Sequence, residues 1–210
     1  MIFLQQFVFL VITYAISAIP FGLVISKFCA KIDIREMGSK NIGATNVARI
    51  LGKKLGFVTL ILDGLKGAVM VIIARFSFSE IENLHLFLAI VSAVAVVGHI
   101  YPIYLRFKGG KGVATAIAVL FALDFGVGFL VTCFWILAFC LFRISSVASI
   151  VAIFSSIILS SRFDSPTSEI VLCWFLAILI LIRHKENIVR LLVGEESSVA
   201  ADKTKSSTSS

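Results

Sequence analysis

Two glycine-rich segments carry hydroxyl, amide and basic side chains at a density typical of phosphate-binding sites. The first runs Gly38-Ser-Lys-Asn-Ile-Gly-Ala-Thr-Asn-Val-Ala-Arg49, and the second ends in Lys-Gly-Gly-Lys-Gly-Val-Ala-Thr at residues 108–115. Glycine lets a ligand approach backbone N–H groups closely, and Lys or Arg supplies a fixed positive charge. The second segment also leads into an apolar run, and the N-terminus of a helix favours an anion. We therefore expect both segments to bind an oxyanion or a phosphate.

The candidate residues of these segments are glycines, hydrogen-bond donors and bases. They are Gly38, Ser39, Asn41, Thr45, Asn46 and Arg49 in the first segment, and Lys108, Gly109, Gly110, Lys111 and Gly112 in the second. An ordinary loop explains the glycines and Arg49. It explains less well two asparagines and a threonine with no acidic residue between Met37 and Lys54.

A third polar segment begins at Arg183. As a helix it places His184 and Asn187 three residues apart on one face, although a lone His at an interface is more often a solvated or capping residue. Ser146 and Ser149 could donate to the same anion or hydrogen-bond within their own helix. We expect the three segments to converge at one face of the protein.

Motifs of several other chemistries are missing from the sequence. Neither Gly52-Lys53 nor Gly110-Lys111 is followed by Ser or Thr, so no nucleotide-binding loop is indicated. No His is followed five residues later by Asp, no G-x-S-x-G elbow occurs, and no cluster of carboxylates suggests a metal. We expect an enzyme without metal or cofactor, which positions its substrates and stabilises charge.

The composition indicates that the solvent of most of the chain is lipid. Of 210 residues, 59% are apolar and 15% charged, against about 45–50% and about 25% in soluble domains. Intrinsic disorder, a DNA-binding domain and a disulfide scaffold are excluded. The net charge of +7 would suggest nucleic acid in a soluble protein. In a membrane protein it fits the Lys and Arg that collect on the cytoplasmic side, so no nucleic-acid partner is expected.

The apolar residues form six segments, of which one is too long for a single span. The segments are residues 2–26, 55–74, 84–105, 113–142, 144–161 and 170–182. As one helix, residues 113–142 would extend about 45 Å, beyond a hydrocarbon core of about 30 Å. Asp124, Gly126 and Gly128 suit a turn near its middle. Asp63 and Lys66 lie within the second segment, where a mutual ion pair is the natural resolution and a functional role the alternative.

Charge distribution favours dividing the long segment into two. With seven spans, all but three of the 19 Lys and Arg residues fall on one side, Arg75 and Arg162 lying opposite and Lys66 within a span. The sequence therefore predicts an all-α integral membrane protein with seven transmembrane helices, its N-terminus outside and its C-terminus in the cytoplasm. Residues 1–194 form this domain, and residues 195–210 are a disordered polar tail.

The chain resembles the bacterial acyl-phosphate:glycerol-3-phosphate acyltransferases in their three cytoplasmic motifs. The matching runs are Gly38-Ser-Lys-Asn-x-Gly-Ala-Thr-Asn-x-x-Arg49, Gly98-His-x-Tyr-Pro-x-x-Leu-x-Phe-Lys-Gly-Gly-Lys-Gly-Val-Ala-Thr115 and His184-x-x-Asn-Ile-x-Arg-Leu-x-x-Gly194. One departure is Lys40, where the family usually has a glycine. This lysine could alter the flexibility of the loop or add a cation near the phosphates.

The resemblance implies transfer of an acyl chain from acyl-phosphate to the sn-1 hydroxyl of glycerol 3-phosphate, giving lysophosphatidic acid, in the bacterial inner membrane. It implies a catalytic set of Ser39, Arg49, Lys111, His184 and Asn187. His184 would help to hold the phosphates together with Thr45, Ser149 and the backbone from Gly109 to Gly112. The remaining candidates would bind substrate, and partners beyond the bilayer would be other phospholipid-synthesis enzymes.

Two functions of other classes remain open on the sequence alone. A transporter of organic phosphates would share the basic, glycine-rich loops, but it should carry polar residues near the bilayer midplane and paired halves. A non-catalytic membrane scaffold is the third possibility. Because the His/Asp pair is absent, we also hypothesise that the acceptor's own phosphate takes the proton of its hydroxyl.

Overall fold

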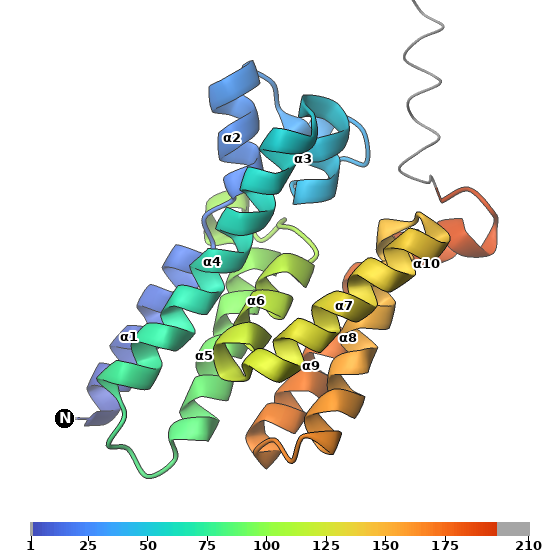
Figure 1. Ribbon diagram of the computed structural model, residues 1–210. Coiled ribbons are helices and arrows are strands. Elements are labelled where there is room, and N and C mark those ends of the chain that lie inside the picture. Colours follow the sequence, from blue (N-terminus) through green and yellow to red (C-terminus); the bar gives the residue numbers. More distant parts are fainter. Residues whose placement is uncertain (1, 197–210) are drawn as a thin grey trace, which may run out of the picture.

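The computed structural model describes residues 2–196, and every regular element within that range is a helix (Figure 1). The α-helices are α1 (Ile2–Ser17), α2 (Phe21–Ala30), α3 (Ala44–Leu51), α4 (Lys53–Ser77), α5 (Leu84–Ile100), α6 (Val113–Leu123), α7 (Phe125–Phe142), α8 (Ser145–Arg162), α9 (Thr167–Arg183) and α10 (Lys185–Leu192). Two short 3₁₀ turns, η1 (Ile34–Glu36) and η2 (Ile103–Leu105), lie in the connections. The all-helical class expected from the sequence is confirmed for this part of the chain.

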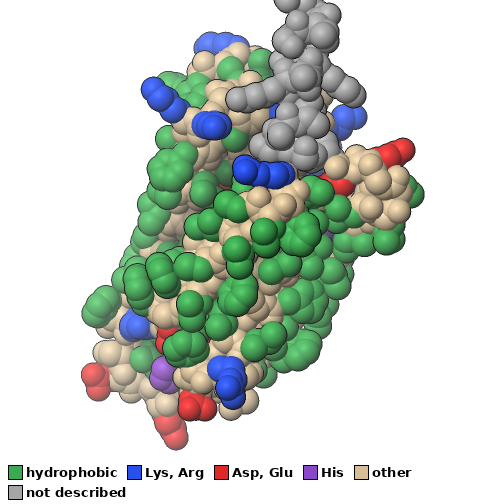
Figure 2. Space-filling view, turned by 45° about the vertical axis from the view of Figure 1, so that its right-hand side comes forward, with side chains coloured by type: hydrophobic (Ala, Val, Ile, Leu, Met, Phe, Trp, Pro, Cys, Tyr) green, Lys and Arg blue, Asp and Glu red, His purple; other side chains and the backbone are tan. Residues whose placement is uncertain are grey.

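Five candidate membrane spans occur among the described residues, or six if the bent pair α9 and α10 counts as one. α1 and α2 together make the first of these, with Pro20 at the break between them. α6 is apolar but short. Figure 2 shows the apolar band that these helices present between two ends that carry charged side chains. This band is the surface expected of a multi-pass membrane protein.

The long apolar segment breaks at the expected place. Asp124 lies between α6 and α7, and its carboxylate caps α7 by accepting a hydrogen bond from the N–H of Val127 at 2.8 Å. After the break, Gly128 lies against the backbone of Phe121, where a Cβ atom would overlap it. The two helices therefore turn back on each other, and a residue larger than glycine would not fit at this crossing.

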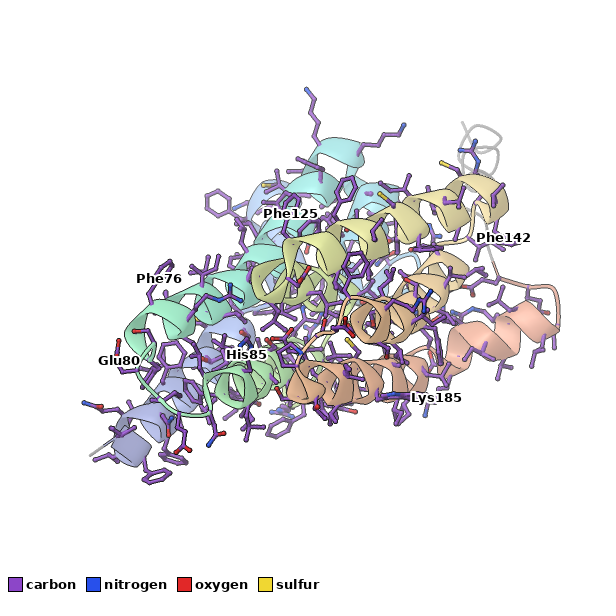
Figure 3. The ribbon with its side chains drawn as sticks, turned by 60° about the horizontal axis from the view of Figure 1, so that its bottom comes forward. Phe76, Glu80, His85, Phe125, Phe142 and Lys185 are labelled. Atoms are coloured by element: carbon purple, nitrogen blue, oxygen red, sulfur yellow. The ribbon has the colours of Figure 1, made fainter. Side chains whose placement is uncertain are left out.

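The two ends of the bundle carry different parts of the chain. Figure 3 places Glu80 and His85 at one end and Phe142 and Lys185 at the other. The chain start and the α4–α5 connection share the first end, whereas α2, α3 and α10 lie toward the second (Figure 1). The first polar segment includes most of α3, the second leads into α6, and the third comprises α10, so all three lie toward the second end.

A buried polar cluster lies between these ends. Lys66 donates to Asp63 at 2.8 Å and to the carbonyl oxygen of Ile19 at 2.8 Å, so the expected ion pair is confirmed. The imidazole Nδ1 of His99, on α5, is 3.6 Å from the same Asp63 oxygen. Each buried charge thus has a partner, which is the condition for retaining charges inside a membrane protein.

Candidate active site

A cavity of about 890 Å³ opens at the end of the bundle where the three polar segments meet. All five residues of the expected catalytic set line it, as do seven of the expected binding residues. The first group is Ser39, Arg49, Lys111, His184 and Asn187, and the second is Gly38, Asn41, Thr45, Asn46, Gly112, Ser146 and Ser149. The expected convergence of the three segments is confirmed, although they are far apart in the sequence.

The first polar segment is held in shape by Asn46, which is almost fully buried. Its amide nitrogen donates to the carbonyl oxygens of Met37 and Asn41 at 3.0 and 2.9 Å, and its oxygen accepts from the N–H of Ser39 at 2.9 Å. Gly38 has φ +57°, and a Cβ atom there would overlap the Asn46 oxygen. Asn46 therefore shapes the loop that presents Ser39, although the sequence suggested a direct role in binding.

The second segment enters the cavity only in part. Lys111 and Gly112 line it, and so do Val113 and Ala114 in the first turn of α6, where helix geometry leaves N–H groups without an intrahelical acceptor. Gly112 has φ +86° and begins the helix in a conformation that glycine adopts without strain. This turn presents a cation and backbone donors together to the cavity.

Three expected binding residues of the second segment lie outside this cavity. Gly109 and Gly110 direct their N–H groups to the carbonyl oxygens of Ile100 and His99, at 3.0 and 3.3 Å, so these donors close the end of α5. Gly110 packs against the His99 ring, and Lys108 and Gly109 line a second, smaller pocket instead. The two amides therefore serve the fold of the turn.

The third segment contributes a chain of polar contacts at the corner between α9 and α10, which are bent by 61°. Lys111 donates to the Asn187 side-chain oxygen at 2.5 Å, and the Asn187 amide donates to Glu196. Ser146 and Arg190 also donate to Glu196, both at 2.8 Å. Five side chains, from the second segment, the start of α8, the third segment and the residues that follow it, are thus joined to one another at the cavity wall.

Glu196 is the main residue that the sequence did not single out. It falls in the stretch assigned to a disordered tail, yet its carboxylate accepts from Ser146, Asn187 and Arg190. A polar, aperiodic stretch gives no signal for such contacts, apart from an acidic residue soon after a motif rich in bases. The rest of the tail, residues 197–210, lies outside the described residues.

α7 and α8 also line the cavity, and α8 begins beside the first segment. The hydroxyl groups of Thr45 and Ser145 lie 3.2 Å apart, which connects α3 to the start of α8. Ser149 donates to the carbonyl oxygen of Ser145 at 2.7 Å and accepts from the Trp135 indole at 3.3 Å. Ser149 therefore lines the cavity while it hydrogen-bonds within its own helix.

The electrostatics of the wall follow from burial. Burial lowers the pKa of Lys111 to about 8. Burial, followed by the charge of Lys111, lowers the pKa of His184 to about 4, so its imidazole is neutral at pH 7. Because Nδ1 of His184 lies 2.8 Å from the carbonyl oxygen of Ile180, it carries the proton, and Nε2 is an acceptor. Partial burial would raise the pKa of Glu196, but hydrogen bonds from Asn187, Arg190 and Ser146 lower it overall.

Beyond its polar mouth the cavity has an apolar arm between α4, α6 and α7. Apolar side chains dominate this part of the lining, and Asp63 and His99 of the buried polar cluster also line the cavity. The apolar side chains are Leu60, Ile61, Leu65, Ile117, Ala118, Phe121 and Trp135. Leu60, Ile61 and Leu65 are also exposed on the apolar surface of the bundle. The site therefore joins a phosphate-like environment to a lipid-like one.

Comparisons with known proteins agree with this arrangement. Residues 7–194 match the family model described as Glycerol-3-phosphate acyltransferase. A glycerol-3-phosphate acyltransferase of Wolbachia pipientis subsp. Culex pipiens is 42% identical over 92% of this chain and 98% of its own length. A glycerol-3-phosphate acyltransferase of Ehrlichia canis is 42% identical over 90% of this chain and 96% of its own length.

Two crystal structures of PlsY, an integral membrane glycerol 3-phosphate acyltransferase, share the fold. Each is 38% identical over 92% of this chain and 95% of its own. The glycerol 3-phosphate form superimposes with a TM-score of 0.87, and the lysophosphatidic acid form with 0.85. The chain is therefore a multi-pass membrane protein and belongs to the glycerol-3-phosphate acyltransferase family.

Proposed function

We propose that this protein transfers an acyl chain from acyl-phosphate to the sn-1 hydroxyl of glycerol 3-phosphate, giving lysophosphatidic acid and inorganic phosphate. The single observation that carries this proposal is the lining of the cavity, which combines cations and hydrogen-bond donors with a set of apolar side chains from α4, α6 and α7. An acyl-phosphate has the same two parts, a phosphate group and an alkyl chain. The crystal structures of PlsY with glycerol 3-phosphate and with lysophosphatidic acid support the acceptor and the product.

The residues at the mouth suit a direct displacement. The acceptor oxygen would bond to the acyl carbonyl carbon, and the bond from that carbon to the phosphate oxygen would break, releasing phosphate with the electron pair. Negative charge grows on the carbonyl oxygen and on the departing phosphate in this step. Lys111, Arg49 and the first N–H groups of α6 line the cavity and can stabilise that charge, and Lys111 is already held in place by its hydrogen bond to Asn187. A phosphate leaving group makes a covalent acyl-enzyme unnecessary.

The proton of the acceptor hydroxyl needs a base. His184 is a weak one, because its pKa is about 4 and its Nδ1–H is held by Ile180. A phosphate monoester has a second pKa of about 6, so the acceptor's own phosphate is the better proton acceptor at neutral pH. This supports the substrate-assisted mechanism, in which His184 accepts a hydrogen bond rather than a proton.

The apolar arm would hold the acyl chain and let it reach the bilayer between α4 and α7. With α6 counted as a short seventh crossing, the helices of the bundle fit the proposed seven-span topology. That topology places the cavity at the cytoplasmic face of the inner membrane, where water-soluble glycerol 3-phosphate is available. Most of the Lys and Arg side chains visible in Figure 2 gather toward the end that carries this cavity.

The donor is tested by supplying purified protein in bilayers with radiolabelled glycerol 3-phosphate and one of two donors, palmitoyl-phosphate or palmitoyl-CoA. We expect lysophosphatidic acid from palmitoyl-phosphate alone, with the chain on the sn-1 oxygen as read by regiospecific lipase digestion. Product from palmitoyl-CoA at a comparable rate would refute the proposed donor. No product from either donor would refute the transfer itself.

A further inference from the structure

A second pocket, of about 290 Å³, lies beside the active-site cavity. The loop that carries Lys40 separates the two, since Lys40 lines both. Lys108 and Gly109 line the second pocket and not the first. Two residues of the glycine-rich segment that the proposed reaction does not use are therefore gathered at another site.

The lining of this pocket is strongly basic. Arg35, Lys40, Lys108 and Arg183 contribute to it, and no Asp or Glu occurs among the described residues that line it. Asp33 offsets one of these charges, because the Arg35 guanidinium donates to both of its carboxylate oxygens at 2.9 and 2.6 Å. The other three cations have no carboxylate partner among residues 2–196. Such a concentration of positive charge favours an anion.

Arg183 lines the pocket and has two contacts that hold its guanidinium in place. Its guanidinium donates to the carbonyl oxygen of Gly109 at 3.2 Å and lies over the Tyr101 ring, 5.7 Å from the ring centre. Its Nε is a buried donor without a hydrogen-bond partner within residues 2–196. A fixed guanidinium suits a phosphate group, because little side-chain entropy is lost when the ligand binds.

The backbone around the pocket is strained at three positions. Lys40, Arg106 and Phe107 have φ values of 58°, 51° and 64°, in the left-handed region. A residue other than glycine is strained there, and such strain persists where the surrounding structure imposes it, often at ligand sites. A glycine would relieve the strain at residue 40, whereas only a longer side chain such as lysine brings a charge to both cavities.

We propose that this pocket binds a phosphate group at a site separate from the active-site cavity. Its volume holds a phosphate or a glycerophosphate and is too small for an acyl chain. The phosphate group could come from a free anion, such as inorganic phosphate or glycerol 3-phosphate, or from the headgroup of an anionic phospholipid. Because binding here needs no acyl transfer, the site stands independently of the proposed reaction.

The free-anion source is tested by equilibrium dialysis of the purified protein against radiolabelled inorganic phosphate at constant ionic strength. The test variant is Arg35→Gln with Lys108→Gln, which changes two bases that line the second pocket and not the first. The control is Lys53→Gln with Lys54→Gln, which removes two exposed lysines that line neither cavity. We expect two phosphates per chain in the wild type and the control, and one in the test variant. If the test variant does not fold, Lys108→Gln alone makes the same comparison.

The lipid source is tested by native mass spectrometry of the same proteins taken from bilayers that contain phosphatidylglycerol and phosphatidylcholine. Retention of phosphatidylglycerol that falls at least twofold in the test variant, with no change in the control, assigns the site to a lipid headgroup. Loss of one bound phosphate assigns it to a free anion. The proposal is overturned if the test variant equals the control in both measurements.

Discussion

The ammonium group of Lys111 lies 2.5 Å from the side-chain oxygen of Asn187, although 76 residues separate them in the chain. This contact joins the glycine-rich turn before α6 to the corner between α9 and α10. It places a cation of lowered pKa in the wall of the candidate active site. Most of the testable consequences concern this cation and the side chains and backbone that hold it.

The first prediction concerns pH. Because burial lowers the pKa of Lys111 to about 8, the free enzyme loses this positive charge as the pH rises through 8, and with it the attraction for phosphate. We expect kcat/KM for glycerol 3-phosphate to fall about tenfold per pH unit above that value. Initial rates between pH 6 and 9.5 measure it, and a profile that stays flat to pH 9.5 would show that the charge of Lys111 is not needed.

The second prediction concerns Gly110. A Cβ atom at this position would overlap the His99 ring, so Gly110→Ala must displace either the ring or the turn that carries Lys111. We expect a loss of roughly 1–3 kcal/mol of stability from overpacking, and a large loss of turnover. Thermal unfolding and initial rates measure both effects. Gly126→Ala is the control, because Gly126 does not line the cavity and a Cβ atom there would be 3.2 Å from its nearest neighbour. Equal losses of stability and turnover in the two variants would show that the contact of Gly110 with His99 does not matter.

The third prediction concerns Glu196, whose pKa is lowered by hydrogen bonds from Asn187, Arg190 and Ser146. A carboxyl group with a lowered pKa in the folded state stabilises the fold above its unfolded pKa of about 4.5, and this contribution is lost as the pH falls further. We expect Glu196→Gln to unfold at a lower temperature than the wild type at pH 7, with the gap closing below pH 4.5. Glu195→Gln, at the exposed neighbouring residue, is the control. A difference in unfolding temperature that does not depend on pH would show that the charge of the Glu196 carboxylate is not what stabilises the fold.

The fourth prediction concerns the acyl chain. Ala118 lies on the wall of the apolar arm, about 7.5 Å along α6 from Val113. Leucine at this position would exclude about two methylene groups, each worth about 0.8 kcal/mol. We therefore expect Ala118→Leu to lower the rate with palmitoyl-phosphate about tenfold relative to decanoyl-phosphate. Val69→Leu, on the exposed side of α4, should leave the ratio of the two rates unchanged. An unchanged ratio in Ala118→Leu would show that the acyl chain does not bind in the apolar arm.

Much of the architecture could be predicted because it depends on local patterns. The break at Asp124 follows from a segment longer than the bilayer, and the pairing of Asp63 with Lys66 follows from the expense of a lone charge in lipid. The five catalytic candidates line one cavity, as expected. Ser39 and Lys111 adjoin glycines in the sequence, whereas His184 and Asn187 were singled out by their spacing of three residues in a segment predicted to lie on the same side of the membrane.

The rest depended on tertiary contacts that no local pattern records. The N–H groups of Gly109 and Gly110 turn toward α5, and just before them Arg106 and Phe107 adopt left-handed conformations that their side chains do not favour. The ordering of Glu196 depends on three donors brought from two other segments. Asn46 shapes a loop rather than simply facing a ligand, and the same side chain would serve either purpose.

The most direct test of the proposed acyl transfer is the stoichiometry of lysophosphatidic acid and inorganic phosphate formed from palmitoyl-phosphate and glycerol 3-phosphate. We predict one of each per turnover in the wild type, and a rate at least about 100-fold lower in Lys111→Ala and in Arg49→Ala, with unfolding temperatures close to that of the wild type. Near-native rates in both folded variants, or phosphate released without lysophosphatidic acid, would contradict it.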